Sequence, residues 1–147
     1  MDFTLSTEQK MIQDLCKNLV KNEIAPIAEE MDKTGEFPYA VWKKMGGLGI
    51  TGIPFPEQYG GGELDWLSMN IAIEEISRGD AGFGASLLDS VALAANLIFT
   101  FGNDEQKKTF LVPLATGEKI GAFGLTGPQA GSDANSIQTR AVLEGDE

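Results

Sequence analysis

Histidine is absent from this chain of 147 residues, and cysteine occurs only once. The first absence excludes every catalytic base, acid or metal ligand of the imidazole type, and no metal site is predicted. The single cysteine, Cys16, falls in an apolar stripe with helical spacing. It cannot form a disulfide within the chain, so a reducing, cytoplasmic environment is expected.

Basic residues are also few. The chain has 11 Lys and Arg against 22 Asp and Glu, which gives a formal net charge of −11. Nucleic acids and anionic membranes are bound through basic surface, so neither is an expected partner. The first residues, Met1 to Thr4, carry no basic or arginine-rich run, and no signal or transit peptide is predicted.

Long apolar runs are rare, and the exception is residues 81–101. A helix of that length would cross a bilayer. Against this, Gly82 and Gly84 weaken its first turn, Asp89 and Asn96 are costly in lipid, and no basic flank fixes an orientation. We therefore expect the central and most buried helix of a bundle. Asp89 is the one charge near the core, and its carboxylate is expected either to reach solvent at the rim or to border a functional pocket.

Apolar residues recur at three- and four-residue spacing in five segments, and each segment has a start signal at its beginning. Ser6 with Gln9, and Asn103 with Gln106, have the spacing of a capping box. The expected helices are 6–32, bent at Pro26; one from Pro38 to the glycines at 46–49; 66–77, capped by Asp65; 81–101; and 103–114, with Phe110, Leu111 and Leu114 inward. Glu74 and Glu75 are interpreted as a solvated face or a structural pair without a catalytic role.

The chain changes character in the segment 120–133, IGAFGLTGPQAGSD. Its first half is small and apolar and predicts a buried strand, and a second strand is predicted at Ile137 to Leu143. The second half has the composition of a turn, because Gly127-Pro128 and Gly131-Ser132 interrupt regular backbone. Glycines allow main-chain N–H groups to approach a ligand closely, and hydroxyls add polar contacts. On pattern alone this is either an ordinary loop or a site for a flat polar ligand.

The same segment resembles the signature of acyl-CoA dehydrogenases, the flavoproteins that desaturate acyl-CoA thioesters. The usual form is small–aromatic–x–[Leu/Val]–Thr–Glu–Pro–x–Ala–Gly–Ser–Asp. Here residues 122–126 read AFGLT and residues 127–133 read GPQAGSD, so Gly127 stands where the family usually carries Glu. Three further passages are similar to the family: 48–61, with LGI and PEQYGG; 74–77, EEIS; and 102–108, GNDEQKK. The general character is that of the short-chain, butyryl-type enzymes.

The resemblance implies a mainly α fold. Residues 1–117 are expected to form the N-terminal helical bundle, and residues 118–147 to begin the middle β domain, which is incomplete. The sequence Gly145-Asp146 fits the start of a hairpin turn whose second strand lies beyond the chain. The strand at 137–143 is then an open edge, expected to pair with another chain, to lie against the helices or to promote association.

The resemblance also implies a cofactor and a reaction. Carried over by position, Phe123, Leu125 and Thr126 would contact the flavin of FAD, and Ser132 the flavin or the CoA thioester. Asp89 would border the acyl-chain pocket. The reaction removes an α proton and a β hydride from an acyl-CoA. No residue matches the family base, which lies beyond residue 147, so no catalytic residue is assigned and the isolated chain is expected to be inactive.

Implied partners are an acyl-CoA, electron-transfer flavoprotein as acceptor, and further copies of the chain, since the complete family forms homo-oligomers, as tetramers. Two alternatives stay open. One is a non-catalytic helical interaction domain derived from the family, which the acidic surface permits. The other is a relative of the acyl-CoA oxidase type, because the flavin loop is shared.

Overall fold

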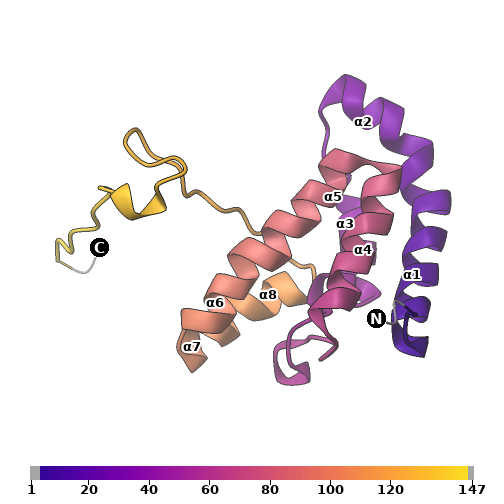
Figure 1. Cartoon of the computed structure of the whole chain (residues 1–147), viewed down its shortest axis with the longest axis horizontal. Helices are drawn as coiled ribbons and strands as arrows, with labels where there is room; N and C mark the ends of the chain where they lie inside the picture. Colours follow the sequence, from indigo (N-terminus) through magenta and orange to yellow (C-terminus); the bar gives the residue numbers. More distant parts are fainter. Residues whose placement is uncertain (1–3, 146–147) are drawn as a thin grey trace.

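The computed structural model describes residues 4–145, and nearly all of the regular structure lies between Thr7 and Ala115. The helices pack into one body. After this body the chain continues as a largely irregular arm, which runs outward from the helices to the C-terminal end (Figure 1). The arm carries the signature segment, so the fold separates the helical scaffold from the candidate site residues.

The first predicted helix is confirmed as one helical run in four parts. Helix α1 (Thr7–Leu19) is followed by a π-helical turn (Val20–Ile24), a 3-10 turn (Ala25–Ile27) and helix α2 (Ala28–Thr34). At its start Gln9 N donates to Ser6 Oγ at 3.1 Å and Ser6 N donates to Gln9 Oε1 at 3.0 Å, the predicted capping box. Pro26 lies in the 3-10 turn, where the regular helical hydrogen bonding changes.

The other four predicted helices are also present. Two of them have the expected caps: Asp65 accepts a hydrogen bond from Ser68 N at 2.7 Å, and Asn103 forms a capping box with Gln106. Short 3-10 turns lie at Ile50–Gly52, Glu57–Tyr59 and Ala134–Ser136. The helical elements are α3 (Tyr39–Gly47); α4 (Trp66–Gly79); α5 (Ala81–Leu88), a π-helical turn (Asp89–Ala95) and α6 (Asn96–Phe101); and α7 (Asp104–Gln106), a π-helical turn (Lys107–Leu111) and α8 (Val112–Ala115).

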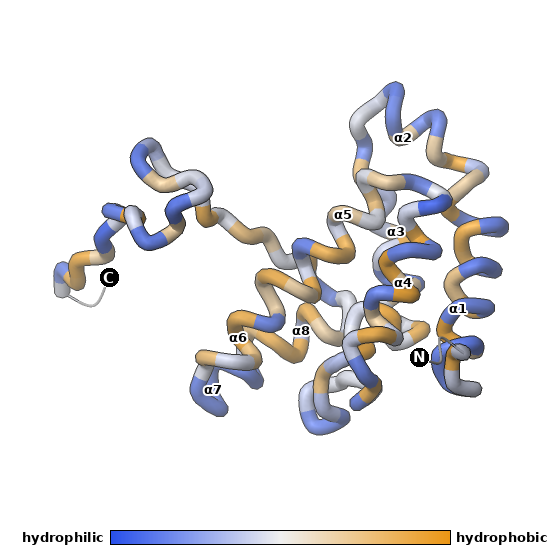
Figure 2. Tube along the Cα trace, in the orientation of Figure 1, coloured by the Kyte–Doolittle hydropathy of each residue, from blue (hydrophilic) through white to orange (hydrophobic). Residues whose placement is uncertain are grey.

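The core contains buried apolar residues of α1, α3, α4, α5 and α8, of the three π-helical turns and of the segment between α3 and α4. Trp42 is 1% exposed, and its ring lies edge-on to Phe83 with 6.1 Å between centroids. Phe37 contacts both rings. Apolar residues also run along α5, α6 and α8 (Figure 2). Aromatic contacts of this kind add to the free energy gained from removing apolar surface from water.

The helix at 81–101 is the one described segment that is long and apolar enough to span a membrane. Phe83, Leu87 and Val91 are buried in the protein core. The prediction that it is the most buried helix is wrong. Six of its 21 residues are buried, three in α5 and three in the π-helical turn, against six of 14 in α4.

The inward position predicted for Phe110 is also wrong, because its side chain is 56% exposed. Leu88, on the helix expected to be the most buried, is 38% exposed. The helices pack on one side of each run and leave the other side open. Leu111 and Leu114 are buried as expected. Periodicity marks an apolar face, but it does not say how wide a face the neighbouring helices cover.

Between residues 4 and 145 the structure has no β-strand. The segments 120–125 and 137–143, predicted as strands, have no ladder of hydrogen bonds to a neighbour. A strand is stabilised by pairing across a sheet, and the described arm supplies no partner. The helical part of the expected fold is therefore observed and the beginning of a β domain is not. Gly145 has a positive φ of 70°, and Asp146, with which it was expected to form a turn, lies outside the described residues.

Cys16 is completely buried, and burial, with a smaller contribution from the charge of Glu75, raises the pKa of its thiol to about 12. The thiolate is the reactive form, so iodoacetamide at about pH 9 should leave the folded chain unmodified and label it after unfolding. Because the folded pKa lies above the unfolded one, the thiol's contribution to stability is full below about pH 9 and is lost as the pH rises toward 12. Rapid labelling of the folded chain, followed by mass spectrometry, would contradict this prediction.

Candidate functional site

The four residues predicted to bind a cofactor all lie on the arm. Phe123 is 38% exposed and Leu125 is 46% exposed. The side chains of Thr126 and Ser132 are exposed as well. Two apolar side chains and two hydroxyls are thus open to a ligand, and the helices do not enclose them.

The turn of the signature segment is formed locally. Gly127 N donates to Ala130 O at 3.0 Å, and Ala130 N donates to Gly127 O at 3.2 Å. Ser136 N donates to Asp133 O at 3.1 Å, and the Ser136 hydroxyl also donates to the Asp133 carboxylate. Ala130 is 3% exposed. These bonds hold the turn between Thr126 and Ser132 without help from the helical body.

The arm is joined to the helices at Gly121. Gly121 N donates to Ser90 Oγ at 2.9 Å, and Ser90 is completely buried. Two residues earlier, Lys119 N donates to Pro113 O at 2.9 Å. Among the residues described, Gly121–Ser90 is the last hydrogen bond along the chain between the arm and the helical body. Neither Ser90 nor the contact made by Gly121 was predicted from the sequence. The available signal was a serine inside a mostly apolar run.

Asp89 lies in a different place from the other predicted site residues. It is exposed on the long helix, directly before Ser90, which agrees with the expectation that its carboxylate reaches solvent at the rim of the core. The carboxylate remains hydrated at the surface, as is usual for an unpaired acidic side chain. The structure therefore places Asp89 next to the joint of the arm, the contact between Ser90 and Gly121. No contact brings Asp89 together with the predicted flavin residues of the arm.

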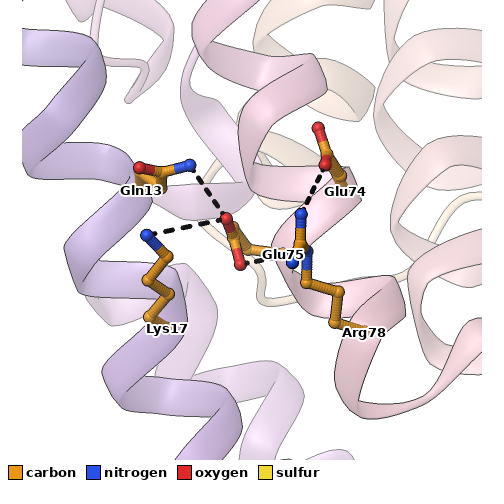
Figure 3. Close-up of polar contacts among 5 residues, drawn as sticks. All are labelled: Gln13, Lys17, Glu74, Glu75 and Arg78. Carbon is orange, nitrogen blue, oxygen red and sulfur yellow. Dashed lines mark hydrogen bonds and ion pairs between the residues drawn. The ribbon is translucent and has the colours of Figure 1, made fainter.

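Among the residues that the structure describes, Glu75 is the one buried carboxylate, with 3% of its surface exposed. Figure 3 shows its polar contacts. Its Oε1 accepts a hydrogen bond from Gln13 Nε2 at 2.9 Å and lies 4.0 Å from Lys17 Nζ. Its Oε2 lies 3.4 Å from Arg78 Nε. Glu74 is exposed and pairs with the same arginine. Glu75 thus links α1 to α4, in agreement with the structural interpretation of the pair.

A pocket of about 390 Å³ lies apart from the arm. It opens between the turn after α2 and the turn that joins α4 to α5, and Phe37, Phe83, Asp32, Glu36 and Asp80 contribute to its lining. None of the predicted site residues reaches it. In the part of the chain that the structure describes, no group of three or more Cys, Asp or Glu side chains is placed to hold a metal ion.

Residues 6–118 match the family described as acyl-CoA dehydrogenase, N-terminal domain, which covers most of the helical body described above. The chain belongs to the acyl-CoA dehydrogenase family. The helical order and the capped starts are thus the family's N-terminal domain. The signature segment lies beyond this match, and relatives that cover 99% to 100% of the chain confirm the resemblance at the level of the family.

Three relatives show the extent of the similarity. The short-chain specific acyl-CoA dehydrogenase of Clostridium acetobutylicum is 49% identical over 146 residues, which cover 99% of this chain and 38% of that protein. A chain of a structure described as the electron transferring flavoprotein of Acidaminococcus fermentans has a TM-score of 0.93 and 47% identity, over 99% of this chain and 38% of its own. An acyl-CoA dehydrogenase of Bacillus anthracis complexed with FAD has a TM-score of 0.84 and 39% identity, over 91% and 23%.

The matched region is only a part of each of these relatives. The chain spans only 38% to 39% of the length of the first curated acyl-CoA dehydrogenases that it matches. The comparisons therefore establish the family and the fold of the helical body. The activity of the whole protein is the subject of a proposal.

Proposed function

We propose that this chain supplies the N-terminal part of an FAD-dependent acyl-CoA dehydrogenase that introduces an α,β double bond into an acyl-CoA thioester. The observation that carries the proposal is a family helical domain followed by an exposed signature segment with its own preformed turn. When bound, FAD accepts the hydride that leaves the β carbon. The α proton leaves as well, and no residue of this chain is proposed as its base.

The exposed residues of the arm fit one face of a flavin. Phe123 and Leu125 offer apolar surface, and Thr126 offers a hydroxyl together with backbone polar groups. A methyl group placed at Gly124, Gly127 or Gly131 would meet no atom within 4 Å, so a ligand has room to approach the backbone at three points. A donor near the ring edge stabilises the negative charge that develops as the flavin is reduced.

We assign the following roles within this proposal. Phe123 and Leu125 contact the flat ring, and Thr126 donates to it through its hydroxyl or its N–H. Ser132 contacts the flavin or the CoA thioester. Asp89 borders the acyl chain, which is consistent with its exposed position on the long helix.

The proposed partners are an acyl-CoA substrate, electron-transfer flavoprotein as the electron acceptor, and further copies of the chain in a homo-oligomer, a tetramer. The acceptor is supported by the similarity to a chain of the structure described as the electron transferring flavoprotein of Acidaminococcus fermentans. A short acyl chain is supported by the similarity to a short-chain specific enzyme. A cytoplasmic location is proposed from the single buried thiol.

The proposal is tested on the full-length product of the gene. Purified protein should contain FAD, detected by its visible absorbance and by chromatography after denaturation, and should form enoyl-CoA from short acyl-CoAs with an artificial acceptor. Thr126→Ala should lower the rate at least tenfold, whereas Thr109→Ala, an exposed threonine on the helical body, serves as the control. A full-length protein that binds no FAD would favour an interaction domain, and hydrogen peroxide formed with oxygen as acceptor would favour an oxidase.

The glycine at position 127 allows a specific prediction. Its backbone already pairs with Ala130, its φ is not positive, and a side chain would meet open space. Gly127→Glu in the full-length protein should therefore restore the family's usual residue and tighten FAD binding or leave it unchanged. Equilibrium titration of the apoprotein with FAD measures this. A tenfold weaker affinity, about 1.4 kcal/mol, would show that glycine is required here.

The isolated chain of 147 residues is expected to form no enoyl-CoA, even with FAD added. Its candidate flavin residues are exposed on one arm, and catalysis requires a site that holds both reactants and excludes water. Short acyl-CoAs with an artificial electron acceptor provide the assay. Sustained product formation that is lost in Thr126→Ala would overturn the expectation, and Asp89 would then be the first candidate for the base.

A further inference from the structure

We infer that Ser90 is a positioning residue for the flavin segment, acting through the amide of Gly121. This inference rests on the proposed function, because the segment that it positions is the one assigned to FAD. Ser90 touches neither flavin nor substrate in this assignment. Its hydroxyl fixes the point at which the arm leaves the helices, two residues before Phe123.

The contact has the features of a specific joint. Ser90 is completely buried within a mostly apolar helix, and its hydroxyl accepts a hydrogen bond from Gly121 N at 2.9 Å. Burying a hydroxyl without a hydrogen-bond partner costs free energy, so the buried Ser90 side chain favours the arrangement in which it binds the Gly121 amide. In the described chain this is the last hydrogen bond between the arm and the helical body. It therefore fixes the position from which the following residues of the arm begin.

The backbone of the arm also needs a small residue here. A methyl group at Gly121 would lie 2.7 Å from Ala94 Cβ and 3.2 Å from Ser90 O. Ser90 and Ala94 are one turn apart on the long helix. The surface between them lies so close to the arm that position 121 has no room for a side chain. At Gly124, three residues further on, the same methyl group would meet nothing within 4 Å. The close approach is therefore confined to the joint.

The position of the joint connects the two halves of the proposed site. Asp89, assigned to the acyl chain, directly precedes Ser90, and Phe123, assigned to the flavin, follows Gly121 by two residues. One hydrogen bond thus sets where the arm's flavin residues start relative to the helix that carries Asp89. Loss of the bond should alter how FAD is held more than it alters the folding of the helices.

The experiment uses the full-length protein and Ser90→Ala, with Thr51→Val as the matched control. Thr51 is also completely buried, and its hydroxyl donates to Ala115 O at 2.9 Å, but that bond lies inside the helical body. We expect hydrogen exchange at the Gly121 amide to accelerate at least tenfold in Ser90→Ala and to stay unchanged in Thr51→Val. The visible circular dichroism of bound FAD should change, and the FAD dissociation constant should rise at least threefold, only in Ser90→Ala.

A second pair of variants approaches the joint from the arm, where the substituted residues lie outside the helices. Gly121→Ala should accelerate exchange across residues 119–123, whereas Gly124→Ala should not. Unchanged exchange and an unchanged flavin spectrum in both Ser90→Ala and Gly121→Ala would overturn the inference while the proposed function stands. A wild-type protein without FAD would overturn the proposed function, and the inference with it, by a different observation.

Discussion

Gly46→Ala is expected to destabilise the helical body by about 3 kcal/mol or more, close to the upper end of what overpacking usually costs. A methyl group at this position would lie 2.3 Å from Thr116 O and 2.7 Å from Gly117 Cα, both of which are backbone atoms. Backbone cannot rotate away as a side chain can. The contact also joins α3 to the turn after α8, so the clash falls where the chain leaves the body toward the arm.

The adjacent residue provides the control for this prediction. Gly47 lies in the same helix, has no positive φ, and would place a methyl group in open space. Gly47→Ala should therefore stabilise the protein by about 0.5–1 kcal/mol, because glycine loses more backbone entropy than alanine in a helix. Urea unfolding followed by circular dichroism gives both free energies. Equal effects at the two positions would show that the close approach at Gly46 does not exist in solution.

Glu75→Ala is expected to lower the free energy of unfolding by about 2–3 kcal/mol, through a lost charge-assisted hydrogen bond and a small cavity. The carboxylate is the central partner of Gln13, Lys17 and Arg78, and its removal separates α1 from α4 (Figure 3). The loss stays below that of a fully buried ion pair, because the lysine and arginine side chains are 49% and 62% exposed and remain hydrated.

Glu74→Ala is the matched control, since Glu74 precedes Glu75 in the same helix but is 65% exposed. Its pair with Arg78 is a surface pair, and its removal should change the stability by no more than about 0.5 kcal/mol. A second measurement separates charge from packing. The charge of Glu75 contributes to the raised pKa of Cys16, so Glu75→Ala should lower the pH at which the thiol becomes reactive. An unchanged thiol pKa together with a full loss of stability would assign the effect to packing alone.

The amino-acid sequence by itself determined the five helical runs and their starts. Ser6, Asp65 and Asn103 cap the helices that were predicted to follow them, because a capping side chain acts on amides only two or three residues away. The family was also readable from the sequence, since its motifs are contiguous. The location of the candidate flavin residues in one segment, Phe123 to Ser132, follows from the same contiguity, whereas their role remains a prediction.

Only the tertiary structure decided which positions face inward. Phe110 and Leu88 carry apolar side chains at helical spacing and are nevertheless exposed, whereas the charged Glu75 is buried because Gln13 lies opposite it on a helix 62 residues away in sequence. Ser90 and Gly121 meet across 31 residues. The predicted strands lack a partner in the described chain for the same reason: pairing, burial and partner choice depend on segments distant in sequence, which local patterns do not specify.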